Sequence, residues 1–381
     1  MWISLIGTWI QTVALSWLVF QLTDSAFLLG LVGFLGSIPI FLFSLFGGVL
    51  ADRLNKRNIL ITTQIIFMFL AFGLAYLTQS NLITPIIVMI IALLNGTVMA
   101  FDAPSRQAMV VEMVGRDHLP NAIALNSVAF NSSRIIGPAV AGILVAGIGM
   151  SGCFYINGVS FLAVIIALFY VRIGHIRPSK NHTALRALKE GLAYVKNHNL
   201  IFALISMVGV VSLFGVSYAI LMPVFANDVL KVGVKGLGFL MSASGFGALI
   251  GALILARLGD FKSKGRFVMA SCFIFSLSLI LFSLTRDFTL SLIILAFIGG
   301  TSVTSVALIN TILQTKATDE FRGRVMSVFM LTFAGIMPFG NLIAGYLAQE
   351  FGVSFAVMAS GVVCGIFFIL INIFYPQIKD I

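Results

Sequence analysis

The stretch Gly48-Val49-Leu50-Ala51-Asp52-Arg53-Leu54-Asn55-Lys56-Arg57 gathers one acid and three bases in a chain that has few charges. Apolar runs flank it on both sides, over about 27–50 and 59–78. A run of about 20 apolar residues is enough for one helical crossing of a bilayer. We therefore interpret the stretch as a short polar connector between two membrane-spanning helices.

The same alternation continues along the chain. Of the 381 residues, 60% are hydrophobic and 9% are charged, whereas soluble domains have about 45–50% apolar and about 25% charged residues. A soluble globule of this composition would expose large apolar patches. The composition predicts an all-α polytopic membrane protein with twelve transmembrane helices, at about 2–22, 27–50, 59–78, 82–101, 121–149, 152–172, 200–226, 237–257, 267–285, 289–314, 324–348 and 353–375.

The basic residues are distributed unevenly between the connectors. Nineteen of the 23 Lys and Arg residues fall in the even-numbered connectors or the C-terminal tail, while Lys231, Lys235 and Arg286 fall on the other side and Arg134 lies inside the fifth segment. Translocated loops exclude positive charge. This predicts a multi-pass protein of the cell (inner or plasma) membrane with both termini in the cytoplasm. It also explains the net charge of +10 without a nucleic-acid partner.

An internal repeat is visible in the glycines. Gly137, Gly142 and Gly149 recur as Gly340, Gly345 and Gly352 at an offset of 203, and Asp52 recurs as Asp260 at 208. Transporters are often built from two similar halves. We expect two pseudo-symmetric six-helix bundles, 1–172 and 200–381, joined by a basic connector over 173–199.

Within the connector, apolar residues recur at helical spacing beside basic ones, at Leu185, Leu188, Leu192 and Val195. This pattern is typical of a helix that lies in the cytoplasmic lipid interface. A partly disordered linker is the alternative. Because the first apolar run already begins at Trp2, we also expect that a short cytoplasmic leader is missing.

The pattern G-x-x-x-D-R-x-G-R/K-R/K at 48–57 resembles the signature cytoplasmic loop of the major facilitator superfamily. The chain departs from it at Asn55, and since Asn tolerates positive φ we expect the tight turn to survive. A second copy of the pattern, around Asp260, keeps the acid and the bases but matches the pattern less well. The resemblance implies a conformational latch, closing on a partner near Arg322–Arg324 and formed by Gly48, Asp52, Arg53, Lys56, Arg57 and Asp260. The alternative is a solvated charge run that only sets orientation.

A second block, Phe101-Asp102-Ala103-Pro104-Ser105-Arg106-Gln107, narrows the resemblance to the subfamily of enterobactin exporters and macrolide efflux proteins. The element containing Gly137, Pro138 and Gly142 also resembles the end of an antiporter signature. Its alternative is close packing or a kink. Arg134 is the only charge deep in a predicted span, and we expect it to pair with Asp102, beside Arg106, and to act in gating or in holding an anionic substrate. A static pair or a snorkelling Arg134 remains the alternative.

The cavity of this fold would be lined by the first, fourth, seventh and tenth spans. Its candidate polar residues are Gln11, Asn95, Tyr218, Thr301, Thr304 and Asn310. So few polar groups among Phe and Met favour a bulky amphipathic solute over a sugar. The coupling ion is expected to be a proton, carried by Asp24 or Asp102. No phosphate loop is present, so ATP is not expected.

No cofactor or metal is expected, because the cysteines stand alone in apolar runs and the histidines are scattered. An enzyme would need carboxylate pairs, a His cluster or an activated nucleophile, and the sequence has none of these patterns. We therefore predict a monomeric secondary active exporter of drug-, macrolide- or siderophore-like small molecules that works by alternating access. The alternative is an importer or a lysophospholipid flippase on the same fold.

Overall fold

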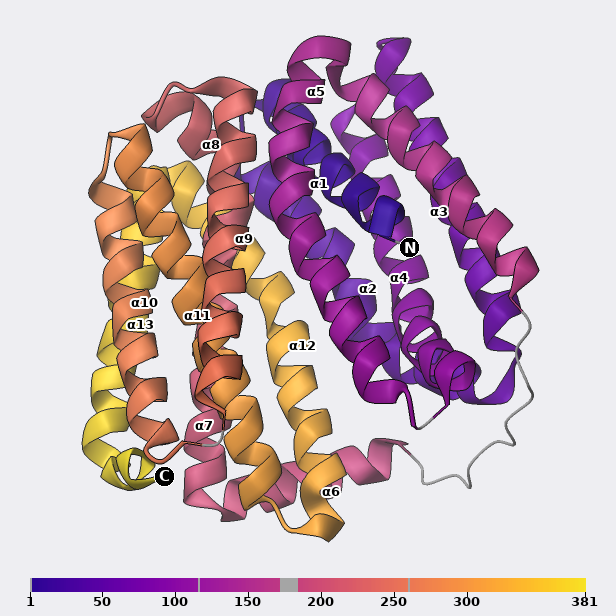
Figure 1. Cartoon of the computed structure of the whole chain (residues 1–381). Coiled ribbons are helices and arrows are strands. Elements are labelled where there is room, and N and C mark those ends of the chain that lie inside the picture. The colour runs from indigo at the N-terminus through magenta and orange to yellow at the C-terminus, as the bar shows by residue number, and fades with distance from the viewer. Residues whose placement is uncertain (1, 116, 172–183, 260) are drawn as a thin grey trace. The chain divides into compact units, whose positions relative to one another are not determined.

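The computed structural model describes residues 2–115, 117–171, 184–259 and 261–381, and this part of the chain is helical without a strand (Figure 1). Eleven of its helices are long and apolar enough to cross a membrane. They are α1 (Trp2–Thr23), α2 (Ala26–Arg53), α3 (Lys56–Gln79), α4 (Pro85–Val114), α5 (Leu119–Tyr170), the segment Asn199–Val229, α9 (Gly233–Leu258), α10 (Lys264–Leu284), α11 (Phe288–Lys316), α12 (Asp319–Phe351) and α13 (Val353–Phe374).

The segment Asn199–Val229 is irregular along its length. Its order is α7 (Asn199–Val210), the π-helix η1 (Val211–Gly215), the 3-10 helix η2 (Val216–Leu221), the single turn α8 (Met222–Val224) and the π-helix η3 (Phe225–Val229). Two shorter helices complete the chain, α6 (Ala184–Asn197) and η4 (Pro376–Asp380).

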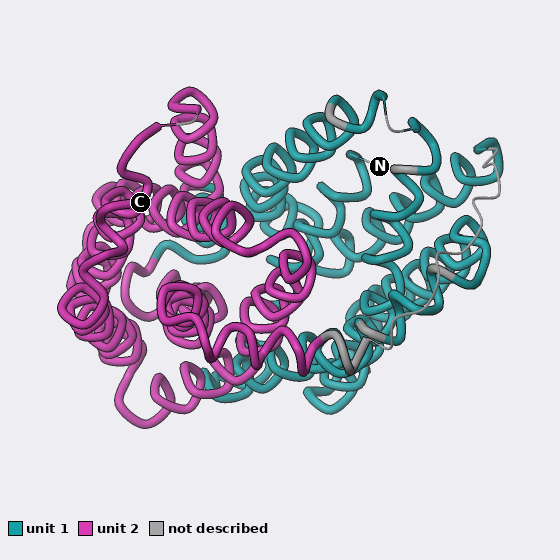
Figure 2. The backbone as a smooth tube through the Cα atoms, turned by 90° about the horizontal axis from the view of Figure 1, so that it is seen from below, with its two compact units in different colours: residues 1–181, 232–242 teal, residues 182–231, 243–381 magenta. Residues whose placement is uncertain are grey.

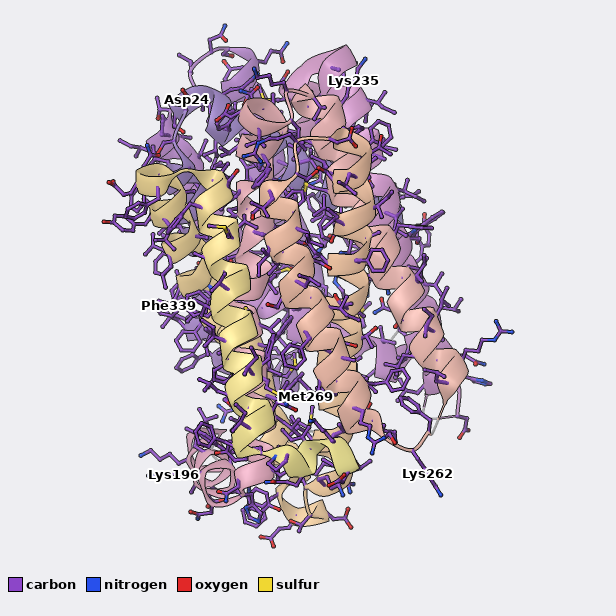
Figure 3. The ribbon with its side chains drawn as sticks, turned by 90° about the vertical axis from the view of Figure 1, so that its left-hand side faces the viewer. Asp24, Lys196, Lys235, Lys262, Met269 and Phe339 are labelled. Carbon is purple, nitrogen blue, oxygen red and sulfur yellow. The ribbon has the colours of Figure 1, made fainter. Side chains whose placement is uncertain are left out.

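The helices form two compact units (Figure 2). Unit 1 contains residues 1–181 and 232–242, and unit 2 contains residues 182–231 and 243–381. Helix α9 begins in unit 1 and continues in unit 2. In unit 2, the labelled side chains of Lys196 and Lys262 lie at one end, whereas Phe339 lies near the middle of the helices (Figure 3).

Glycines bring the helices of unit 1 into backbone contact. A Cβ added at Gly47 of α2 would collide with the carbonyl oxygen of Ala100 in α4, and one at Gly96 of α4 would collide with that of Gly36. Small residues at such crossings let membrane helices approach closely. Phe67, Ala71, Val98 and Phe161 form a buried apolar cluster that joins α3, α4 and α5.

Unit 2 repeats these backbone contacts at matching positions. A Cβ at Gly299 of α11 would collide with the carbonyl oxygen of Ser244 in α9. Gly299 follows Gly96 by 203 residues, and Ser244 follows Gly36 by 208, the two offsets found in the sequence. Likewise, Gly137 of α5 faces Trp9 of α1, and Gly340 of α12 faces Leu213 of η1.

The boundary between the predicted fifth and sixth segments falls inside one helical element, α5. Gly149 interrupts α5 with φ 75° and ψ 175°, which are not helical angles. A left-handed φ of this kind favours glycine because a Cβ would be strained there. Gly352 has φ 87° and ψ 152° at the junction of α12 and α13. The chain therefore changes direction at two glycines that are 203 residues apart.

The described part of the basic connector contains α6. Val195 is buried, and Gly191 lies so close to α12 that a Cβ would be 2.8 Å from the carbonyl oxygen of Arg324. Leu192 is exposed. One face of α6 thus packs on α12 within unit 2, while residues 172–183 and the side chains of 184–187 lie outside the described residues.

Candidate functional site

A buried carboxylate joins α3 and α4 in unit 1. Asp102 is fully buried, and its carboxylate accepts hydrogen bonds from Thr63 Oγ1 at 2.7 Å and Gln64 Nε2 at 2.9 Å. Arg106, one helical turn further along α4, donates to the same carboxylate through two nitrogens at 3.0 and 2.7 Å. We call Thr63, Gln64, Asp102 and Arg106 the Asp102 cluster. Its charges are paired and hydrogen-bonded, as a buried ion pair requires.

The expected pair between Asp102 and Arg134 is wrong. Arg134 is only partly buried on α5 and forms no ion pair with any described residue. Equal depth along two helices does not fix which way each side chain is turned, and Asp102 is turned toward α3. The partner that sequence reasoning missed lies at i,i+4, a spacing that places two residues on one helix face.

Two side-chain atoms, one in the Asp102 cluster and one on a neighbouring residue of α4, have no hydrogen-bond partner among the described atoms. They are Gln64 Oε1 and Ser105 Oγ, and both residues are almost completely buried. Burying a polar atom without a partner costs about 1–3 kcal/mol. The cluster is therefore a buried polar region in which not every polar atom has a partner.

The predicted latch loop is anchored on unit 1. Lys56 Nζ is 2.7 Å from Glu112 Oε1 of α4. Arg57 donates from Nε to the carbonyl oxygen of Leu168 at 2.7 Å and from a terminal nitrogen to that of Phe169 at 2.9 Å. These carbonyls lie in the last turn of α5, where no helical donor remains for them. The two bases thus tie the start of α3 to α4 and α5.

One detail of the latch prediction is corrected. Asn55 has φ −66°, so it does not use positive φ but instead caps α3 by accepting from the backbone N–H of Arg57 at 3.0 Å. The glycine in close contact is Gly47, whereas a Cβ at Gly48 would meet nothing within 4 Å. Arg53 is exposed. The side chain of Asp52 and the whole of Asp260 lie outside the described residues.

The Gly-Pro element of α5 packs on α1 and on the part of α9 that belongs to unit 1. A Cβ at Gly142 would lie 2.9 Å from the carbonyl oxygen of Val234, and one at Gly238 would collide with that of Pro138. Ser242 Oγ donates to the carbonyl oxygen of Ile135 at 2.6 Å. Proline lacks the N–H that would hold the preceding turn. Pro138 leaves the carbonyl oxygen of Arg134, four residues earlier, without a helical donor, and the Ser242 hydroxyl bonds the next carbonyl oxygen, that of Ile135.

The six candidate cavity residues do not hydrogen-bond to one another in the described structure. In unit 1, Asn157 donates to Gln11 at 2.7 Å, and Asn95 donates to the carbonyl oxygen of Ile91 in its own helix. In unit 2, the hydroxyls of Tyr218 and Ser244 are 2.9 Å apart. The remaining three lie on α11: Thr301 donates to the carbonyl oxygen of Phe297, Thr304 faces Gly251, and Asn310 accepts from Gln314.

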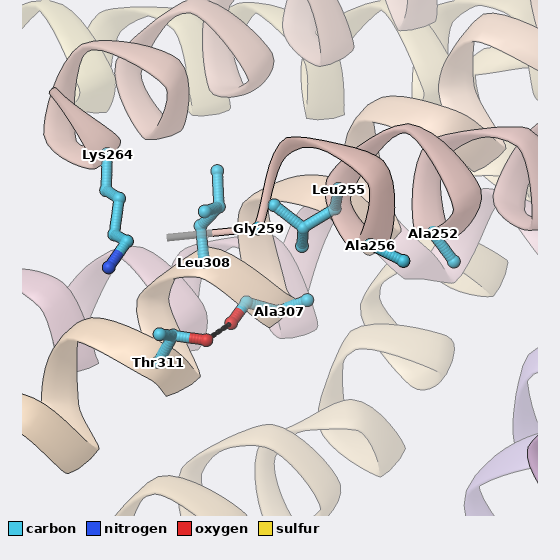
Figure 4. Close-up of a pocket in the computed structure, with 8 residues that line it drawn as sticks. All are labelled: Ala252, Leu255, Ala256, Gly259, Lys264, Ala307, Leu308 and Thr311. Carbon is cyan, nitrogen blue, oxygen red and sulfur yellow. Dashed lines mark hydrogen bonds between the residues drawn. The ribbon is translucent and has the colours of Figure 1, made fainter. Parts of the chain in front are cut away.

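Unit 2 also contains a groove that the sequence did not predict. It has a volume of about 480 Å³ between α9 and α11, and Figure 4 shows Ala252, Leu255, Ala256, Gly259, Lys264, Ala307, Leu308 and Thr311 around it. The groove is lined by residues of three separate helices, α9, α10 and α11, and no local sequence pattern predicts it.

The region where the latch partner was expected is paired within unit 2. Arg322 lies 2.6 Å from Asp319, and Arg324 lies 3.1 Å from Glu190 of α6. The ring of Tyr194 stacks on Phe321 with centroids 4.5 Å apart. The contacts of Glu190 with Arg324 and of Tyr194 with Phe321 hold α6 on the first turns of α12, whereas Arg322 pairs within α12.

Long apolar helices and backbone contacts that repeat between two units are typical of a polytopic membrane protein built from two similar halves. The chain belongs to the transmembrane secretion effector family, whose model matches residues 1–380.

Curated relatives match over nearly the whole chain. It is 27% identical to the staphyloferrin A transporter of Staphylococcus aureus, covering 94% of this chain and 91% of the relative. It is 26% identical to macrolide efflux protein A of Streptococcus pyogenes, covering 100% of this chain and 94% of the relative. The chain is thus similar to transporters of efflux and export.

Solved structures show the same fold at low identity. A bacterial homologue of the human lysosomal transporter Spinster, inward-facing and unoccupied, matches with a TM-score of 0.76 at 14% identity, covering 99% of this chain and 96% of that chain. A D-xylose-proton symporter matches with a TM-score of 0.77 at 13% identity, covering 100% of this chain and 98% of that chain.

Proposed function

We propose that this protein is a monomeric secondary active exporter that moves bulky amphipathic small molecules out of the cell by alternating access. The observation that carries the proposal is the match of residues 1–380 to a secretion family. Relatives named for macrolide efflux and enterobactin export support the outward direction. This direction favours export over the importer and flippase alternatives.

We further propose twelve membrane-spanning helices with both termini in the cytoplasm of a plasma membrane. The support is the break at Gly149, since the matching Gly352 separates α12 from α13. If α5 is two spans, a single cysteine at position 151 is labelled by an impermeant maleimide in intact cells, and one at position 117 is labelled only after permeabilisation. The native cysteines are buried and are replaced for this test. Labelling at 117 in intact cells contradicts the topology.

The 48–57 loop, with Asp260, acts in this proposal as the conformational latch. The contacts of Lys56 and Arg57 support it, because a latch must be held rigidly by its own unit before it can engage or release a partner. Asp102 and Asp24 remain the candidate proton carriers. Asp102 is fully buried and forms an ion pair with Arg106.

The deciding experiment measures accumulation of a fluorescent amphipathic dye and of a macrolide in energised cells. Expression should lower accumulation at least severalfold, and a protonophore should abolish the difference. The matched control is Arg134→Ala, checked for equal amounts in the membrane. Increased accumulation contradicts export, and a difference that persists with the protonophore contradicts proton coupling.

A further inference from the structure

Arg134 differs from the other partly buried bases of unit 1 that the structure describes. Lys56 and Arg106 each lie 2.7 Å from a carboxylate oxygen, and Arg57 donates to two carbonyl oxygens of α5. The Arg134 side chain has no hydrogen-bond or ion-pair partner among the described residues. A charge inside a membrane span is costly unless it is paired. The Arg134 guanidinium is therefore a group of donors for which the described residues supply no acceptor.

The segments that pack on α5 next to Arg134 contain no acid. Helix α1 lies beside α5 in unit 1 (Figure 1), and a Cβ at Gly137 would collide with Trp9 there. Residues 232–242, the part of α9 that belongs to unit 1, also contact α5. Neither α1, α5 nor 232–242 contains an Asp or a Glu. A carboxylate therefore cannot reach Arg134 from its own helix or from these two neighbours.

An aromatic surface lies on the same side of α5. Phe130 and Gly137 lie four residues before and three residues after Arg134, spacings that place them on its helix face. Trp9 contacts both of them: its ring centroid is 6.4 Å from that of Phe130, and a Cβ at Gly137 would collide with its side chain. Phe130 nonetheless remains 47% exposed. This face of α5 thus presents a guanidinium and an accessible aromatic ring together.

We propose that Arg134 binds the carboxylate of an anionic amphipathic solute whose apolar body lies against Phe130. A guanidinium can donate to both oxygens of a carboxylate through two parallel hydrogen bonds, which an ammonium cannot do in the same fixed geometry. An aromatic ring adds a large apolar contact area. This inference rests on the proposed transport of amphipathic solutes and adds the chemical group by which such a solute is recognised.

The test is equilibrium binding of two matched probes to the purified full-length protein in a neutral detergent. Pyrenebutyrate carries the carboxylate, and its methyl ester has the same apolar body without the charge. Saturable energy transfer from tryptophan to pyrene measures the binding. The unmodified protein should bind the acid about tenfold more tightly than the ester, the difference expected for one hydrogen bond to a charged group. Equal affinities for the acid and the ester would overturn the proposal without any substitution.

Substitutions then locate the preference for the acid. Arg134→Gln should weaken binding of the acid about tenfold and leave binding of the ester unchanged, whereas Arg134→Lys should keep part of the preference. Phe130→Ala should weaken both probes by a similar factor, about fivefold, because it removes apolar contact and no charge. The matched control is Lys196→Gln, which removes a charge from an exposed residue of α6 and should bind both probes normally. If Lys196→Gln loses the preference as Arg134→Gln does, overall charge explains it and the site is overturned.

A competition experiment separates a solute from a lipid headgroup. Decanoate, an amphipathic carboxylate, should displace pyrenebutyrate, and dioleoyl phosphatidylglycerol should not. Displacement by phosphatidylglycerol, or a failure of decanoate to compete, would overturn the assignment to a carboxylate solute. Binding needs no energised membrane, so it is separate from the export assay. Absent dye export with an intact preference for the acid contradicts the proposed function alone, and normal export without that preference contradicts this inference alone.

Discussion

Replacing Asp102 by alanine tests whether the Asp102 cluster stabilises unit 1. The change leaves Arg106 without its carboxylate and leaves Gln64 Nε2 without an acceptor in a side chain that is only 1% exposed. The Thr63 hydroxyl keeps an acceptor after this change, because it also donates to the carbonyl oxygen of Leu60 at 3.0 Å. Breaking a buried ion pair by removing one partner costs about 3–5 kcal/mol. The Arg106 side chain is 24% exposed and can turn toward water. We therefore expect a loss of stability in the lower half of this range, about 3–4 kcal/mol.

The assay is reversible unfolding in mixed detergent micelles, run as a double-mutant cycle with Arg106→Ala. Asp102→Ala and Arg106→Ala together should cost about 2 kcal/mol less than the sum of the single changes, because residues in direct contact are not additive. Thr63→Val should cost only about 1 kcal/mol. If the unfolding free energy of Asp102→Ala lies within about 1 kcal/mol of that of the unmodified protein, the carboxylate does not stabilise unit 1 and the reasoning fails.

Three further substitutions test single residues. Arg134→Ala should abolish transport and leave membrane insertion normal, because a charged side chain inside a span costs free energy and is usually present for a function. Dye efflux normalised to the amount of protein in the membrane measures this, and normal efflux contradicts it. Arg57→Gln should lower the unfolding free energy by about 1–2 kcal/mol through the lost bonds to α5, and Arg53→Gln, at an exposed position, serves as its control. Gly340→Leu should prevent folding, because even a Cβ would collide with the carbonyl oxygen of Leu213; wild-type yield and gel-filtration behaviour would refute the contact.

The membrane-spanning architecture was predictable because it depends on properties that the sequence states directly. Apolar runs of sufficient length give the helices, and polar connectors give their ends. The boundary at Gly149 was also visible, since a glycine between two apolar runs allows the left-handed φ that the structure has there. The irregular course of 211–229 was not predicted, because a π-helix and a 3-10 helix have the same apolar composition as an α-helix.

The partners of charged residues were predicted less well. The sequence gives the depth of Asp102 and Arg134 along their helices, but a pair also requires both side chains to be turned toward each other. That rotation depends on packing, and here Gln64 and Thr63 of α3 receive Asp102. Asn55 shows the same limit locally. Its preference for positive φ was sound, but the free N–H groups at the start of α3 made capping the better use of its side chain.

The difference between the two units separates what the fold requires from what it does not. Backbone contacts at Gly96 and Gly299 recur because any Cβ would collide at these crossings, whichever solute is carried. The Asp102 cluster has no such counterpart: the positions 203 residues after Asp102 and Arg106 are Ser305, whose hydroxyl bonds within α11, and Ile309, which is fully buried. A neutral version of this helix crossing is therefore compatible with the fold. The ion pair between Asp102 and Arg106 is thus a difference between the two units that their shared fold does not require.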